Sequence, residues 1–259
     1  MRILPFFGLI IGCKANYISG ELDSPVDDTG ETVEDTSAWD GAWMEVITPL
    51  SGDFLPLGED APFEAIVYNA AGEATDFSEI NWATDLDEAW TLVGAAVEDS
   101  SLDVGTHDIS ATAVLPNGDR LVHTLGGILV QHEDAGTYVG NIQVDMAVDY
   151  DGAAYSAGCT GAVTLIVDAW GETASGDSAC TVSLLGYDQD TTYLFDLALD
   201  GGDLSGSADV DLSFFTYSFD VNGDVDDGQL SGTWEDEVLG YIELAGEMSV
   251  SRITREIGE

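Results

Sequence analysis

Two cysteines could form a disulfide bond, Cys159 and Cys180. A hairpin that turns at Ala169 and Trp170 places them directly opposite each other on antiparallel strands. Opposed residues have Cα atoms about 4.5 to 5.5 Å apart, a distance that a disulfide can bridge. The alternative is a catalytic thiol, but no histidine lies near either cysteine in the sequence. We therefore predict the disulfide, which an exported protein can form in an oxidising compartment.

Oxygen-bearing side chains near the end of the chain have the spacing of a calcium loop. The segment DVNGDVDDG, residues 220–228, places four of them at alternate positions: Asp220, Asn222, Asp224 and Asp226. This spacing is typical of the start of an EF-hand loop. Val225 stands where the loop needs glycine, and Ser231 stands where a bidentate glutamate should close the site. The segment is thus a calcium site or a solvated hairpin turn, and these mismatches favour the turn.

Motifs for catalysis are missing from the sequence. There is no Gly-x-Ser-x-Gly segment and no zinc-protease helix motif. We interpret His107 as a structural strand residue, and His123 and His132 lack the spacing of a zinc site. Carboxylates are so abundant that some pair must fall at glycosidase spacing by chance. We therefore expect no enzyme and no cofactor besides calcium, and a carbohydrate hydrolase stays as the enzymatic alternative.

The N-terminal sequence MRILPFFGLIIGC has the layout of an export signal, with Arg2 followed by an apolar run. That run is shorter than the roughly 20 residues that a membrane-spanning helix needs. Its last four residues, IIGC, resemble the lipobox of bacterial lipoproteins. The resemblance implies a signal peptide at 1–12 and lipidation of Cys13 with a diacylglycerol and an amide-linked acyl chain such as palmitate. Lys14, which is not an aspartate, points to the outer membrane, on its periplasmic or cell-surface side.

Charge excludes several kinds of partner. The chain has 50 acidic and 5 basic residues, a formal net charge of −45. Such a surface repels nucleic acids and anionic lipids. Nucleotides are also unexpected, because no lysine follows Lys14 and no glycine-rich phosphate loop is present. The expected partners are the membrane, through the lipid, and a protein, a carbohydrate or a small hydrophobic ligand.

Composition and patterning divide the chain into segments. Residues 13–41 are rich in Asp, Glu, Ser, Thr and Gly and predict an acidic disordered linker. Two all-β domains are expected at 42–130 and 137–254. A short linker at 131–136 joins them, and residues 255–259 form a tail.

The first domain is predicted to be a β-sandwich, because short alternating runs are separated by Gly, Pro, Asn and Asp. The segment LDVGTHDISATAVLPNG, together with Trp82 in INWATDLDEAW and the Gly58–Glu59 pair, resembles bacterial Ig-like domains of the PKD or cadherin-like kind. The resemblance implies that Trp82 fills the space between two sheets. It also implies a role as a spacer or adhesion module.

The second domain alternates apolar and polar residues with period two over several segments. One such set is Ile142, Val144, Met146, Val148 and Tyr150. The outward residues are Asp, Glu, Ser and Thr, so a lipid-facing band is not expected. The alternation shifts by one residue between Leu212 and Phe215, which predicts a β-bulge at 213–214. We predict an antiparallel up-and-down barrel of seven or eight strands.

The barrel's apolar face carries several aromatic residues that could bind a ligand: Tyr193, Phe195, Phe215, Tyr217, Phe219 and Trp234. An eight-stranded barrel is either filled by side chains or holds one small ligand. The second case resembles a lipocalin in architecture, although GTYVG at 136–140 stands in place of that family's Gly-x-Trp signature. We therefore expect a membrane-anchored display, adhesion or structural lipoprotein. A carrier of a small hydrophobic ligand is the main alternative.

The charge of the chain predicts a strong dependence of stability on salt. At about 1 M salt the Debye length falls to about 3 Å, which screens repulsion among the carboxylates. We expect the melting temperature to rise by about 5 °C or more between low and molar sodium chloride. Differential scanning calorimetry measures this, and an unchanged melting temperature would contradict the prediction.

Overall fold

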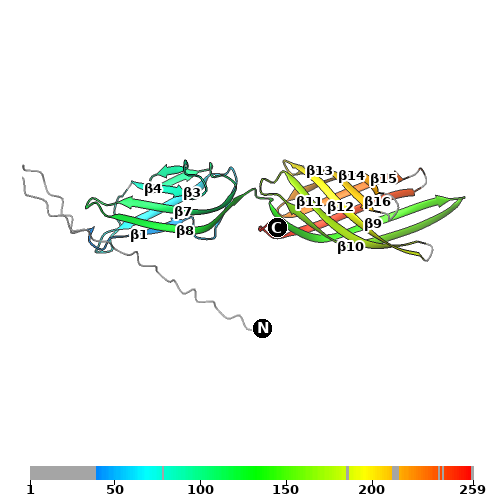
Figure 1. The fold of residues 1–259 in the computed structure, drawn as a ribbon, viewed down its shortest axis with the longest axis horizontal. Helices are drawn as coiled ribbons and strands as arrows, with labels where there is room; N and C mark the ends of the chain where they lie inside the picture. The colour runs from blue at the N-terminus through cyan, green and yellow to red at the C-terminus, as the bar shows by residue number, and fades with distance from the viewer. Residues whose placement is uncertain are drawn as a thin grey trace, which may run out of the picture. The chain divides into compact units, whose positions relative to one another are not determined.

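The computed structural model describes residues 39–77, 79–184, 187–211, 216–238, 240 and 242–257. It is built from sixteen strands, β1 to β16 (Figure 1). The described residues divide into two compact units, one formed from 39–55 and 59–129 and the other from 56–58 and 130–257. No helix of the described residues is long and apolar enough to cross a membrane. The signal peptide, Cys13 and the linker as far as residue 38 lie outside the described residues, as do the expected bulge at 213–214 and Phe215.

Strands β1 to β8 form two sheets. The three-stranded sheet has the order β1 (Trp43–Thr48), β3 (Ala61–Tyr68) and β6 (Ala96–Asp99). The five-stranded sheet has the order β2 (Phe54–Pro56), β8 (Arg120–Gln131), β7 (Gly105–Val114), β4 (Ile80–Thr84) and β5 (Thr91–Val93). The alternating burial of β3 and β7 shows one covered face on each sheet.

Aromatic packing joins these two sheets. Trp82 on β4 is fully buried, its ring centroid lies 5.5 Å from that of Phe63 on β3, and its indole nitrogen donates to the Gly94 carbonyl at 3.0 Å. His107 is also fully buried between two partners, Thr84 Oγ1 at 2.9 Å and the Asp103 carbonyl at 2.7 Å. The expected positions of Trp82 and His107 agree with this packing. The Ig-like assignment stays a prediction.

The second unit is a closed eight-stranded barrel in which every strand pairs antiparallel with the next and β16 pairs with β9. Its strands are β9 (Gly136–Tyr150), β10 (Ala153–Val167), β11 (Thr173–Leu184), β12 (Tyr187–Asp200), β13 (Asp203–Asp211), β14 (Thr216–Asp226), β15 (Gln229–Val238) and β16 (Ile242–Thr254). The predicted up-and-down barrel is therefore confirmed. Buried and exposed residues alternate along the strands, as β15 and β16 show.

The predicted disulfide between Cys159 and Cys180 is present, with Cα atoms 5.8 Å apart. The predicted register was wrong, because Ala162 pairs with Ala179 and the cysteines are therefore two positions away from direct opposition. The turn is centred one residue later than expected, between Trp170 and Gly171. Hydrogen bonds from residues 170–173 to Asp168 and the positive φ of 70° at Gly171 produce this longer turn.

Two pairings in the barrel end before either of their strands does. Strands β10 and β11 pair over six residues, from Val167↔Ala174 to Ala162↔Ala179, and the two cysteines of the disulfide lie beyond this point. Strands β14 and β15 pair over five residues, from Asp226↔Gln229 to Asn222↔Thr233. Beyond this point β14 stays paired with β13 as far as Thr216, and β15 stays paired with β16 as far as Val238. Residues 216–221 and 234–238 therefore have no backbone pairing with each other in the described part of the chain. We call these two facing edges the seam.

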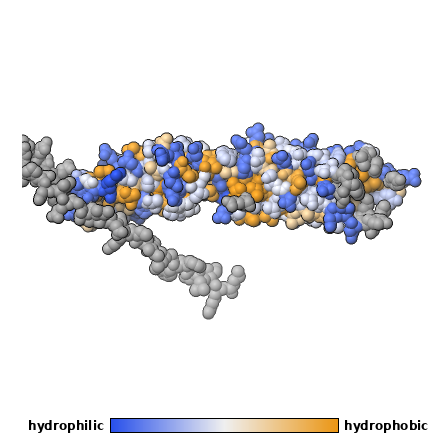
Figure 2. All heavy atoms as spheres, viewed as in Figure 1, coloured by the Kyte–Doolittle hydropathy of each residue, from blue (hydrophilic) through white to orange (hydrophobic). Residues whose placement is uncertain are grey.

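Hydrophilic, intermediate and hydrophobic residues are mixed over the surface in view on each unit (Figure 2). In the barrel the strand alternation directs apolar side chains inward and carboxylates outward. The outer wall is therefore the acidic part of the barrel.

The disulfide closes a loop between residues 21 positions apart. In the chain-entropy model such a bond stabilises the folded state by about 3 kcal/mol. We expect the double variant Cys159→Ser/Cys180→Ser to lose about this much free energy of unfolding in urea titrations. A reductant should lower the free energy of unfolding of the wild type and leave that of the variant unchanged. Equal stabilities of the two proteins in oxidising buffer would contradict the prediction.

Candidate functional site

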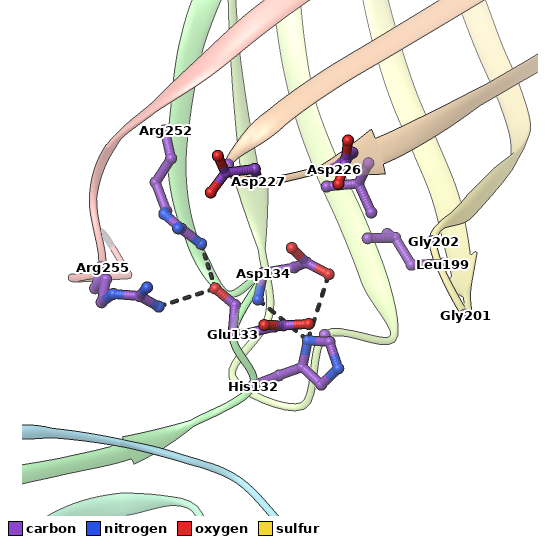
Figure 3. Close-up of a pocket in the computed structure, with 13 residues that line it drawn as sticks. His132, Glu133, Asp134, Leu199, Gly201, Gly202, Asp226, Asp227, Arg252 and Arg255 are labelled. Carbon is purple, nitrogen blue, oxygen red and sulfur yellow. Dashed lines mark hydrogen bonds and ion pairs between the residues drawn. The ribbon is translucent and has the colours of Figure 1, made fainter. Parts of the chain in front are cut away.

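A polar hollow of about 570 Å³ opens at one end of the barrel, and we call it the mouth pocket (Figure 3). The turns after β10, β12 and β14 meet there with the start of β9 and the end of β16. Its lining residues are His132, Glu133, Asp134, Gly171, Leu199, Gly201, Gly202, Val225, Asp226, Asp227, Gly228, Arg252 and Arg255. Arg252 and Arg255 are two of the three arginines that follow Lys14 in the sequence. Two of the few cations of the chain therefore line this pocket, together with four carboxylate residues.

Both guanidinium groups in the pocket point toward one backbone carbonyl (Figure 3). Arg252 Nη1 and Arg255 Nη1 each donate to the carbonyl of Glu133, the latter at 2.8 Å. Arg252 also lies 6.0 Å from the ring centroid of Tyr138, which is within cation–π range. Burial lowers the pKa of Arg255, and the neighbouring Arg252 lowers it further. These two hydrogen bonds hold the chain segment that precedes β9.

Further hydrogen bonds fix the same segment to the barrel. The Tyr138 hydroxyl donates to the Asp134 carbonyl at 2.7 Å, and the backbone N–H of His132 donates to the Ala169 carbonyl at 2.8 Å. Gln131 Nε2 donates to the carbonyl of Arg255 at 2.9 Å. Residues 131–135 are therefore fastened to the end of the barrel from several strands and turns.

Two titratable side chains of the pocket, His132 and Asp134, lie close to each other. His132 Nδ1 accepts a hydrogen bond from the backbone N–H of Asp134 at 3.2 Å and lies 3.7 Å from that residue's carboxylate. No serine, threonine, cysteine or lysine is among the described lining residues, so the pocket offers none of these side chains as a nucleophile.

The β10–β11 turn, which forms one wall of the pocket, is organised by Asp168. Its carboxylate accepts hydrogen bonds from the backbone N–H groups of Trp170, Glu172 and Thr173 and from the Thr173 hydroxyl. Partial burial raises the pKa of Asp168, but these hydrogen bonds to the charged form outweigh it and leave the pKa below its usual value. Gly171 then passes so close to His132 that a Cβ atom would lie 2.3 Å from the imidazole ring.

Four of the predicted ligand-binding aromatics lie in the barrel core, where they pack against one another. Tyr193, Phe195, Phe219 and Trp234 are each at most 3% exposed. The Trp234 ring stacks on Phe219 with centroids 5.3 Å apart and lies 6.1 Å from Phe195. Tyr217 is half-buried and donates to Asp236 Oδ2 at 2.9 Å. Side chains fill this level of the barrel, and ligand binding by these residues stays a prediction.

The predicted calcium ligands lie along strand β14 and not in a loop. Asp220, Asn222 and Asp224 alternate along the strand, and Asp226 ends it beside the mouth pocket. The turn itself is made by Asp227, with φ 46°, and Gly228, with φ 71°. Within the described ranges, no group of three or more His, Cys, Asp or Glu side chains could hold a metal ion. A calcium site here therefore rests on the sequence spacing alone.

A second hollow, of about 690 Å³, lies on the outer wall of the barrel, and we call it the wall hollow. It spans strands β14, β15, β16 and β9, at the point where the β14–β15 pairing ends. Its lining residues are Gln143, Asp145, Asp220, Asn222, Thr233, Trp234, Glu235, Ala245, Gly246 and Glu247. Four of these carry carboxylates, and the lining includes no cation.

Sequence reasoning missed both hollows. The signal available for the mouth pocket was the pair Arg252 and Arg255, because two of the few cations stand three residues apart. Nothing in the sequence marks the wall hollow, since the alternation of β14 and β15 does not reveal where their pairing stops.

No protein-family model and no curated protein matches this chain. Among solved structures, the chain is similar to isotype 1 transferrin-binding protein B from serogroup B Neisseria meningitidis, with 10% identity and a TM-score of 0.28. The match covers 75% of this chain and 49% of that chain, so this chain corresponds to about half of that protein. A likeness of this size carries no argument about function.

The hydrogen bonds at Asp168 predict a pH-dependent contribution to stability. Because its pKa is lowered in the folded state, the contribution is present above the unfolded pKa of about 3.9 and is lost as the pH falls through the lower, folded value. We expect Asp168→Asn to lower the free energy of unfolding by about 1 kcal/mol at pH 7 and by much less near pH 3. Urea titrations at several pH values measure this.

The matched control is Asp177→Asn, which removes the same charge from an exposed position on β11. It should change stability little at either pH. If Asp168→Asn and the wild type differ in free energy of unfolding by the same amount near pH 3 as at pH 7, the role of the ionised carboxylate is refuted.

Proposed function

We propose that this protein is a non-enzymatic binding module, held at the outer membrane by lipid on Cys13 and displayed to partners through the outer wall of its barrel. The observation that carries the proposal is the packed interior. Tyr193, Phe195, Phe219 and Trp234 contact one another across the barrel. An eight-stranded barrel filled in this way has its free surface on the outside.

The geometry of the mouth pocket supports the same proposal. Arg252 and Arg255 hold residues 131–135 against the end of the barrel, so the chain's own segment occupies part of this opening. The lining lacks a hydroxyl or thiol nucleophile among the described residues, which argues against acyl transfer. No observation of this structure favours a glycosidase over the binding module.

The electrostatics of the chain define which partners such a module would meet. The chain has 50 acidic and 5 basic residues, and its acidic outer wall therefore attracts cationic surfaces and repels anionic ones. Attraction of this kind raises association rates and selects partners by charge. A basic protein surface or peptide is therefore the partner class that fits best. An interior carrier stays the second candidate, because the barrel presents an apolar face inward.

The role of the anchor is tested with Cys13→Ser in the native cells. We expect the wild type to sediment with membranes, to carry lipid and to be cleaved by protease added to intact cells. The variant should be soluble and keep the melting temperature of the wild type, because Cys13 precedes the described residues of both units. Wild-type protein that is soluble and unlipidated, or that intact cells protect from protease, would overturn the proposal of a displayed module.

A further inference from the structure

Strands β14 and β15 leave two facing backbone edges in the barrel wall. Their pairing ends at Asn222↔Thr233, whereas each strand continues for about five more residues and stays paired on its other side. A strand edge without a partner presents a row of N–H and C=O groups that another extended chain can pair with. The seam presents two such rows to the same space.

Side chains, in place of backbone pairing, connect the strands along the seam. The Tyr217 hydroxyl donates to Asp236 Oδ2 at 2.9 Å, and the rings of Phe219 and Trp234 stack beneath. Trp234 is 2% exposed, and its indole nitrogen has no hydrogen-bond partner in the described part of the chain. A buried donor without a partner is rare in native proteins. The inner side of the seam is thus apolar and holds an unused donor.

The outer side of the seam is acidic. Asp220 on β14 and Glu235 on β15 belong to its two edges and line the wall hollow, where Asp145 and Glu247 add two more carboxylates. No described cation lines this hollow. A second copy of the chain, or its own acidic linker, would bring further negative charge to this surface. Charge complementarity therefore selects a basic occupant.

We propose that the seam binds an extended basic peptide segment, which adds a strand between β14 and β15. Strand addition of this kind takes its affinity from main-chain hydrogen bonds and its specificity from alternate side chains. Inward residues of the segment contact Phe219 and Trp234 and are apolar. Outward residues lie beside Asp220 and Glu235 and are lysine or arginine. This inference rests on the proposed function, for which it names the partner and the contact surface.

Two peptides separate strand pairing from simple attraction of a polycation. The first is a capped peptide of about seven residues that alternates lysine and valine, a length that matches the seam. The second is the same peptide with its valine amide nitrogens methylated, which keeps its charge but removes the donors along one edge. Calorimetric titration of the mature protein gives both affinities. We expect the first peptide to bind at least about tenfold more tightly.

Amide hydrogen exchange locates the binding. The alternating peptide should slow exchange at 216–221 and at 234–238 together, and the methylated peptide should not. The double variant Asp220→Lys/Glu235→Lys should weaken binding of the alternating peptide by about tenfold or more. Its matched control is Asp177→Lys/Asp196→Lys, which makes the same charge change at exposed positions on strands β11 and β12, neither of which pairs with β14 or β15. This control should keep the affinity close to that of the wild type.

Equal affinities for the two peptides, or protection spread over the acidic wall without the two edges, would overturn strand addition and leave only non-specific attraction. Equal weakening by both double variants would overturn it as well. None of these outcomes bears on the anchored location of the protein, which the Cys13→Ser experiment tests separately. A protein that is displayed at the cell surface but does not pair with the peptide at the seam would contradict this inference and leave the proposed function intact.

Discussion

Repulsion among 50 carboxylates is the constraint on which the rest of the structure depends. A chain with so few cations cannot neutralise its surface with ion pairs, and so the carboxylates must point outward to water and salt. The barrel meets this requirement in its strands, where apolar residues alternate with acidic ones and only the apolar set is buried. Two of the few arginines donate hydrogen bonds to a backbone carbonyl at the mouth pocket.

Closure of the barrel uses covalent and non-covalent links at different places. The disulfide joins β10 to β11, and full-length backbone ladders join most other neighbours. Between β14 and β15 the ladder is short, and aromatic stacking with one phenol–carboxylate hydrogen bond spans the rest. The ladder between β10 and β11 is also short, and there the disulfide links the two strands. Between β14 and β15 the described links are side-chain contacts alone, and we therefore propose this place as the contact surface.

The features that repeat every second residue could be predicted from the sequence. Alternation identified the barrel and its inward residues, and cysteine spacing identified the disulfide. The predicted register of that hairpin was wrong because four hydrogen bonds to the Asp168 carboxylate lengthen its turn. The spacing of the cysteines in the sequence does not reveal the length of this turn. The mouth pocket depends on contacts between residues 119 or more positions apart, such as Arg252 with Glu133. The seam depends on where a ladder stops, which a single strand's pattern does not show.

The central claim is that the barrel works through its outer wall while its interior is filled. Native mass spectrometry of the lipidated protein, purified from its own membranes, tests this most directly. The account predicts a polypeptide that begins at lipid-modified Cys13 and releases no small apolar molecule when it unfolds. A stoichiometric hydrophobic compound that leaves only on unfolding would contradict the account and make the barrel a carrier.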